Sequence, residues 1–296
     1  MDLVSLFVAI VVIIAFATVL ITISTRKGGK KRGRQKNRAQ IIRDATRKLS
    51  QDPHNPDGLI SLGDVYFKEH SWEKAYQIYD TMLSIAPAHT EIDPFTAALR
   101  QGICALKLNK IQDAFRGLPA AYQINPSNFE VNYYLGLACY SNKEYDKAVP
   151  CLKKALVANP EAPNVNSSLG LALYKGKHYK ECLPFLNRAL NENPDNKEAL
   201  FSMADAMQEC GYGEKAMKVF LHLRPDPEFG TRSCLAAGII HANSNQYEKA
   251  MQDFEIGLKH QEVSPEVSIE LRYRYANACF ATKNIAKGIT LLREIQ

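Results

Sequence analysis

The sequence predicts an all-α protein in which a single N-terminal transmembrane helix precedes a solenoid of paired helices. Two observations predict this architecture. A run of 21 residues without a charge occupies positions 3–23, and a pattern of small and aromatic residues recurs every 34 positions along most of the remaining chain. The alternation of apolar and polar residues that would indicate strands does not recur, so no sheet is expected.

Residues 3–23 are long enough to cross a membrane as a helix. They read LVSLFVAIVVIIAFATVLITI, and at about 1.5 Å per residue they would span roughly 30 Å, the thickness of a bilayer core. A cleaved signal peptide would begin with basic residues and have a shorter apolar core, whereas this chain begins with Met1 and Asp2. We therefore expect residues 1–25 to form a transmembrane anchor.

Basic residues are concentrated directly after the apolar run. Residues 26–48 contain 11 Lys and Arg, whereas residues 51–296 contain 26 basic and 29 acidic residues. The positive-inside rule then places the N-terminus outside and the rest of the chain in the cytoplasm. The segment would also contact anionic lipid, at about 1 kcal/mol per basic residue, or serve as a topology signal alone. The residues expected at the membrane surface are Arg26, Lys27, Lys30, Lys31, Arg32 and Arg34.

The recurring pattern is defined by small residues and a proline at fixed positions of a 34-residue repeat. The small residue at position 8 is Gly63, Gly102, Gly136, Gly170, Ala204, Gly238 and Ala276. A second small residue, at position 20, is Ala75, Ala114, Ala148, Cys182, Ala216, Ala250 and Gly288. Position 32 is proline in four copies, at Pro87, Pro126, Pro160 and Pro194.

This pattern resembles the tetratricopeptide repeat (TPR) family from about Pro56 onward. The resemblance implies a right-handed superhelical solenoid over residues 56–296, in which each repeat has two antiparallel helices that approach closely at positions 8 and 20. Proline would end the second helix. Residues 90–94 and 265–268 are expected to be insertions between repeats. The seven predicted repeats, the last incomplete, are 56–89, 95–128, 129–162, 163–196, 197–230, 231–264 and 269–296.

In this family the first helices of the repeats line a concave groove, which positions 5, 9 and 12 usually face. The resemblance therefore predicts a groove that receives a helix or an extended peptide of another protein. The alternative is that the same side chains pack inside the solenoid. The residues predicted to line the partner-binding groove are Tyr133, Leu137, Tyr140, Leu171 and Tyr174.

The sequence contains no GxGxxG, P-loop, HExxH or GxSxG motif, so we predict no enzymatic activity, cofactor or metal. The seven cysteines include no CxxC pair, which suits a reducing compartment. No nucleic-acid partner is expected, because the excess of basic over acidic residues is confined to one short segment without aromatic residues.

The layout is similar to that of bacterial lipopolysaccharide-assembly TPR regulators, although their CxxC domain is missing. We predict a membrane-anchored TPR scaffold or adaptor on the cytoplasmic face of a membrane, with homo-oligomerisation as a possible further property. The alternative is an envelope-assembly or periplasmic TPR protein held by an uncleaved signal anchor.

Overall fold

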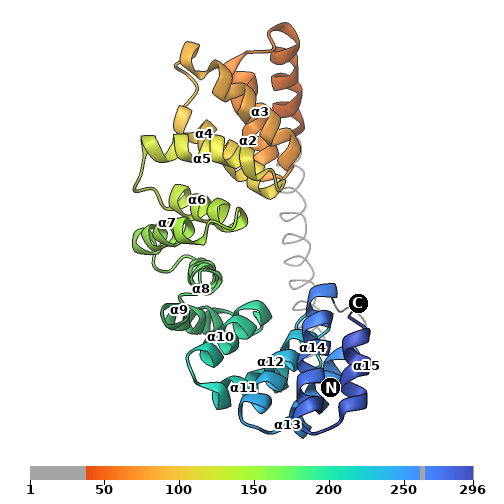
Figure 1. The fold of residues 1–296 in the computed structure, drawn as a ribbon. Coiled ribbons are helices and arrows are strands. Elements are labelled where there is room, and N and C mark those ends of the chain that lie inside the picture. The colour runs from red at the N-terminus through yellow and green to blue at the C-terminus, as the bar shows by residue number, and fades with distance from the viewer. Residues whose placement is uncertain (1–37, 261–263, 296) are drawn as a thin grey trace, which may run out of the picture. The chain divides into compact units, whose positions relative to one another are not determined.

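The computed structural model describes residues 38–260 and 264–295 (Figure 1). In this part of the chain the regular structure is helical and includes no strand. The predicted anchor at residues 1–25 and the basic residues from Arg26 to Arg34 lie outside the described residues. No helix among the described residues is long and apolar enough to cross a membrane.

The chain forms two compact units, Met1–Asn125 and Pro126–Gln296. In the first unit, residues 38–51 are helical and precede two helix pairs. These pairs are α2(Pro56–Lys68) with α3(Trp72–Ile85), which continues into the 3-10 turn η1(Ala86–Ala88), and α4(Pro94–Lys107) with α5(Ile111–Ile124).

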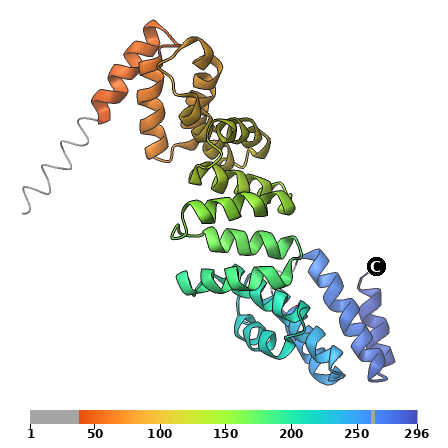
Figure 2. The same cartoon turned by 90° about the vertical axis from the view of Figure 1, so that its left-hand side faces the viewer.

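The second unit is a helical-repeat solenoid of five further pairs. Its helices from α6 onward stack in chain order, with each pair packed against the next (Figure 2). The pairs are α6(Phe129–Ser141) with α7(Tyr145–Ala158), α8(Val165–Lys175) with α9(Tyr179–Glu192), α10(Lys197–Glu209) with α11(Gly213–Leu223), α12(Gly230–Asn243) with α13(Tyr247–Leu258), and α14(Pro265–Ala281) with α15(Ile285–Arg293).

The two helices of a pair approach closely at the small residue of position 8. A Cβ atom added at Gly136 would lie 2.6 Å from Leu152 Cγ, and one at Gly170 would lie 2.8 Å from Leu186 Cδ2. In these two pairs the residue that occupies this space is 16 positions further along the chain. The same relation joins Gly63 to Tyr79, Gly102 to Leu118 and Gly238 to Phe254.

The turn between the two helices of a pair has the same backbone conformation in all seven pairs. The residue at position 15 of each repeat has a positive φ, and the N–H of the next residue donates to a carbonyl five residues earlier, as in Glu144 to Cys139 at 2.8 Å. This arrangement is the Schellman motif that ends many helices. The residues with positive φ are His70, Asn109, Lys143, Lys177, Gly211, Asn245 and Lys283.

The helix over residues 38–51 packs against α2. Ala45 is buried, and the Leu49 side chain lies where a Cβ at Gly58 would fall. Lys48 forms an ion pair with Asp57 at 2.7 Å, and Arg38 forms one with Glu69. Residues 38–48, which were expected to belong to the basic membrane-proximal segment, therefore include a helix that packs on the first repeat. Its apolar residues follow a spacing of three and four, which covers one helix face.

One of the two expected insertions is part of a helix. α14 begins at Pro265, so residues 265–268 form its first turn instead of a connection between repeats. Ser264 caps this turn, because its side chain accepts a hydrogen bond from the N–H of Val267. A serine followed by proline is a favoured way to begin a helix. In the other insertion, Asp93 caps α4 and Pro94 is its first residue.

Candidate protein-interaction surface

The first helices of the pairs in the second unit form one continuous face. α6, α8, α10 and α12 contact one another in sequence, and in Figure 1 they lie on the inner side of the curve that this unit makes. The second helices α7, α9, α11 and α13 lie on the outer side. Side chains that point away from the second helices are therefore brought together from successive repeats.

On α6, three of the predicted groove residues, Tyr133, Leu137 and Tyr140, are half-buried. The Tyr133 ring stacks on Phe129 with ring centres 5.7 Å apart and planes 9° apart. The Tyr140 ring meets Tyr145 edge to face at 5.6 Å. Their neighbours hold these rings in place while part of each stays accessible. This combination suits contact with a partner, because little conformational entropy remains to be lost on binding.

On α8, Leu171 and Tyr174 are more buried than expected, with exposed fractions of 8% and 9%. The Tyr174 hydroxyl donates a hydrogen bond of 2.7 Å to Asp205 Oδ2 on α10. Burial, reinforced by the negative charge of Asp205, raises the pKa of Tyr174 well above its usual range. The burial of these two side chains favours the alternative, in which they pack inside the solenoid, and α10 contacts Tyr174 through Asp205. Their part in partner binding stays a prediction.

Acidic and cationic groups lie close to these tyrosines. Burial raises the pKa of Tyr140 to about 12, and the negative charge of Glu198 adds to the shift. Arg232 on α12 places its guanidinium carbon 4.2 Å from the centre of the Phe201 ring, a cation–π contact. Glu198 is exposed and Asp205 is half-buried. The face therefore combines aromatic surface with carboxylates.

Asp205 and Arg232 are not among the groove residues predicted from the sequence. Asp205 could have been found from its repeat position. Tyr174 is at position 12 of its repeat and contacts Asp205, which is 31 residues later at position 9 of the next repeat. The first unit has a comparable network around position 9. There, Arg100 donates to the Tyr79 hydroxyl at 2.8 Å and also pairs with Asp64.

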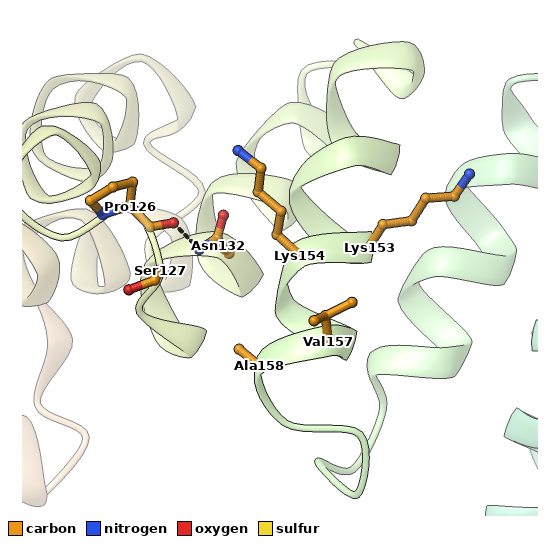
Figure 3. Close-up of a pocket in the computed structure, with 7 residues that line it drawn as sticks. All are labelled: Pro126, Ser127, Asn132, Lys153, Lys154, Val157 and Ala158. Atoms are coloured by element: carbon orange, nitrogen blue, oxygen red, sulfur yellow. Dashed lines mark hydrogen bonds between the residues drawn. The ribbon is translucent and has the colours of Figure 1, made fainter.

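A cavity of about 510 Å³ lies at the edge where α6 begins and α7 ends (Figure 3). Asn132 is fully buried beside it and donates to the carbonyls of Pro126 and Asn128, both at 2.8 Å. Val157 is among the most exposed apolar residues at 82%. In Figure 3 the side chains of Lys153 and Lys154 point away from each other, and Lys153 points away from Pro126 and Ser127. The cavity has room for an apolar side chain. Its lining residues are Pro126, Ser127, Asn132, Lys153, Lys154, Val157 and Ala158.

Residues 136–176, which include the close contact at Gly136 and the turn at Lys143, match the family model described as TPR repeat. This segment is similar to TPR repeats. It contains Leu137, Tyr140, Leu171 and Tyr174, so four of the five predicted groove residues lie within the matched TPR segment.

Solved structures share the fold of the chain. One is described as YrrB, a TPR protein with an unusual peptide-binding site; it is 22% identical, with a TM-score of 0.52, and the match covers 61% of this chain and 92% of that chain. The C-terminal part of a TPR repeat-containing protein from Cytophaga hutchinsonii is 12% identical, with a TM-score of 0.58 and coverage of 79% and 93%. PilF of Pseudomonas aeruginosa is 20% identical, with a TM-score of 0.50 and coverage of 68% and 91%. At these identities the likeness shows the helical-repeat fold.

Proposed function

We propose that the protein is a membrane-anchored TPR scaffold that binds segments of other proteins along the face formed by α6, α8, α10 and α12. The TPR fold itself suggests a protein–protein interaction scaffold. The observation that carries the proposal is the set of half-buried side chains Tyr133, Leu137 and Tyr140 on α6. The two tyrosine rings are held by neighbouring rings and stay partly accessible. Rigid aromatic side chains of this kind are frequent anchors of protein interfaces.

The chemistry of the face specifies the segment that fits it. Apolar side chains of a helix or an extended peptide would pack on Tyr133 and Tyr140, which lie about two helical turns apart on α6, and on Leu137 between them. Glu198 and Glu209 are exposed on α10, so a Lys or Arg in the segment would be attracted to this side of the face. We therefore expect an apolar segment that includes at least one basic residue.

The membrane part of the proposal rests on the sequence. The uncharged run at 3–23 and the basic residues that follow it support an anchor with the N-terminus outside and the repeats in the cytoplasm. Neutralising Arg26, Lys27, Lys30, Lys31, Arg32 and Arg34 to Ser should invert a fraction of the molecules. A protease added to intact cells should then digest the repeats of the variant and spare those of the parent chain. Digestion of the parent repeats would instead favour an envelope or periplasmic protein.

Photo-crosslinking in cells tests the interaction face. The full chain would contain p-benzoylphenylalanine in place of Tyr140, which preserves an aromatic side chain at this position. Irradiation is expected to give adducts of discrete mass with one or a few proteins. The matched control places the same residue at Tyr212, which is 54% exposed at the N-terminal end of α11 and away from the face. Equal adducts from both positions, or none from position 140, would refute the proposal.

A further inference from the structure

Arg232 of α12 is a half-buried cation that has no acidic partner. In the described part of the chain four arginines are half-buried, and the other three each form an ion pair with an acidic side chain. These pairs are Arg100 with Asp64, Arg224 with Asp253 and Arg272 with Glu294. Within residues 38–260 and 264–295, the Arg232 guanidinium takes part in neither an ion pair nor a hydrogen bond. Its N–H groups are therefore available to a ligand.

The Arg232 side chain lies on a fixed aromatic surface. Its guanidinium carbon is 4.2 Å from the centre of the Phe201 ring, and Phe201 is buried. The rings of Phe220 and Phe229 hold Phe201 in place, with ring centres 5.7 and 5.8 Å away. A guanidinium that rests on a ring keeps the N–H donors at its edge free. Because the ring is held, little conformational freedom would be lost when a ligand binds these donors.

The helix pair does not require a cation at this place. Arg232 is at position 2 of its repeat and lies in the first turn of α12, where the positive end of the helix dipole disfavours a basic residue. Among the described residues no side chain caps α12, and the first turn of this helix has no acidic residue. None of the residues at position 2 of the other repeats is basic. They are Asp57, Thr96, Glu130, Asn164, Glu198 and Glu270.

Arg232 belongs to the face formed by α6, α8, α10 and α12. Three of these helices meet near the Tyr174 hydroxyl of α8, which donates to Asp205 of α10 at 2.7 Å. Burial and the charge of Asp205 raise the pKa of Tyr174, and the positive charge of Arg232 opposes this rise. The guanidinium therefore lies close to the aromatic side chains of the face.

The surroundings of Arg232 favour a single carboxylate as its ligand. Glu198 and Asp205 lie about one helical turn before and after Phe201 on α10, and neither forms an ion pair with Arg232 within the described chain. A ligand with several negative charges, such as a phosphate group, would be repelled by these two carboxylates. One carboxylate can instead bind a guanidinium through two parallel hydrogen bonds.

We propose that Arg232 binds one Asp or Glu side chain of the protein segment that occupies the face of α6, α8, α10 and α12. The guanidinium on the Phe201 ring would donate the hydrogen bonds. This inference rests on the proposed function and adds an acidic residue to the apolar and basic residues expected in the segment.

Peptide selection tests whether the face requires an acidic residue. The full chain in nanodiscs is the target. The probe is a library of random peptides whose C-termini are joined to a phage coat protein, so that their carboxylates come from side chains. Peptides selected on the parent chain should be enriched in Asp or Glu. Arg232→Gln should return this content to the level of the unselected library, and Arg232→Glu should enrich Lys or Arg instead.

The matched control is Arg188→Gln, which removes the same charge from an exposed position on α9. This helix is a second helix and lies on the outer side of the unit. Peptides selected on the control variant should have the same content of acidic residues as those selected on the parent chain.

A double-mutant cycle measures the contact itself. A synthetic copy of a selected peptide, with an amidated C-terminus, is titrated against the parent chain and against Arg232→Gln. Replacing its acidic residue by Asn or Gln should weaken binding to the parent about tenfold and change binding to Arg232→Gln by less than about twofold. Arg232→Lys keeps the charge without the planar group and should give an intermediate loss. It replaces Arg232→Gln in the cycle if that variant does not fold.

The outcomes separate this inference from the proposed function. Equal acidic content with the parent and Arg232→Gln, or no coupling in the cycle, would overturn the inference and leave the proposed function standing. Peptides that depend on Arg232 and bind Tyr140→Ala as well as the parent would support the inference and contradict the proposed role of Tyr140. If no peptide binds the parent chain, both proposals fail.

Discussion

Leu152 occupies the space that a side chain at Gly136 would need, since a Cβ there would lie 2.6 Å from Leu152 Cγ and 2.8 Å from its Cδ2. Gly136→Ala should therefore lower the free energy of unfolding by about 1–3 kcal/mol, because α6 and α7 must separate or Leu152 must move. Gly136→Leu should cost more. Urea unfolding followed by circular dichroism measures both.

Gly213→Ala is the matched control for this contact. The nearest atom to a Cβ at Gly213 is 3.6 Å away, an ordinary van der Waals distance. This substitution should be neutral or stabilise by up to about 1 kcal/mol, since it restricts the unfolded chain. If Gly136→Ala changed the free energy of unfolding no more than Gly213→Ala does, the close contact between position 8 and the second helix would be contradicted.

Lys143 has a φ of 62° in the turn between α6 and α7, a conformation that costs an L-residue about 1–2 kcal/mol. Lys143→Gly should remove this cost, although glycine also gives the unfolded chain more conformational freedom. The net result should be a free energy of unfolding that is higher by about 0.5–1 kcal/mol. Lys175→Gly, at the end of α8, should instead destabilise by about 0.5–1 kcal/mol. A loss of stability in Lys143→Gly would argue against the turn geometry.

Tyr174 and Tyr140 occupy the same repeat position and should respond differently to loss of the hydroxyl. Tyr174→Phe leaves Asp205 without the hydrogen bond it accepts and should cost about 1–3 kcal/mol. No hydrogen bond of the Tyr140 hydroxyl is present among the described residues, so Tyr140→Phe should change stability by less than about 0.5 kcal/mol. A double-mutant cycle with Asp205→Asn should show coupling for Tyr174 and none for Tyr140.

The buried thiols predict a loss of stability at alkaline pH. Burial raises the pKa of Cys104 and of Cys182 to about 12, whereas a thiol in the unfolded chain ionises near about 8.5. The unfolded state therefore loses these protons first, and the contribution to stability, complete below about pH 8.5, is lost as the pH rises through 12. Cys182→Ala places at position 20 the residue that most repeats have there. Unfolding free energies measured from pH 8 to 11 should fall less steeply in this variant, and identical slopes would contradict the prediction.

The sequence predicted the parts of the fold that depend on residue type at a fixed spacing. The helices α3, α5, α7 and α9 each end two residues before the proline of position 32, and the glycines of position 8 lie at close helix contacts. The turns were missed because the residue with positive φ is lysine, asparagine or histidine in most repeats, and none of these types alone requires that conformation. Only its constant repeat position is a signal.

The sequence predicted which helices carry the candidate site, but it did not predict which of the side chains are buried. Spacing along α6 and α8 placed the tyrosines correctly on the first helices, but burial of Tyr174 depends on Asp205, which belongs to the next repeat. Likewise, the basic composition of residues 38–48 concealed the apolar spacing of Ala45 and Leu49, which lets this helix pack on α2. In both cases the deciding contact comes from a different helix pair.

The exposed side of α15 has a consequence for how the second unit opens. In a linear array the stability of each pair is the sum of its own stability and its contacts with neighbours. The pair α8 and α9 has neighbours on both sides, whereas α14 and α15 contact only the preceding pair within the described chain. Amide hydrogens of α15 should therefore exchange with solvent faster than those of α9, because fewer contacts within the described residues hold α15 in place.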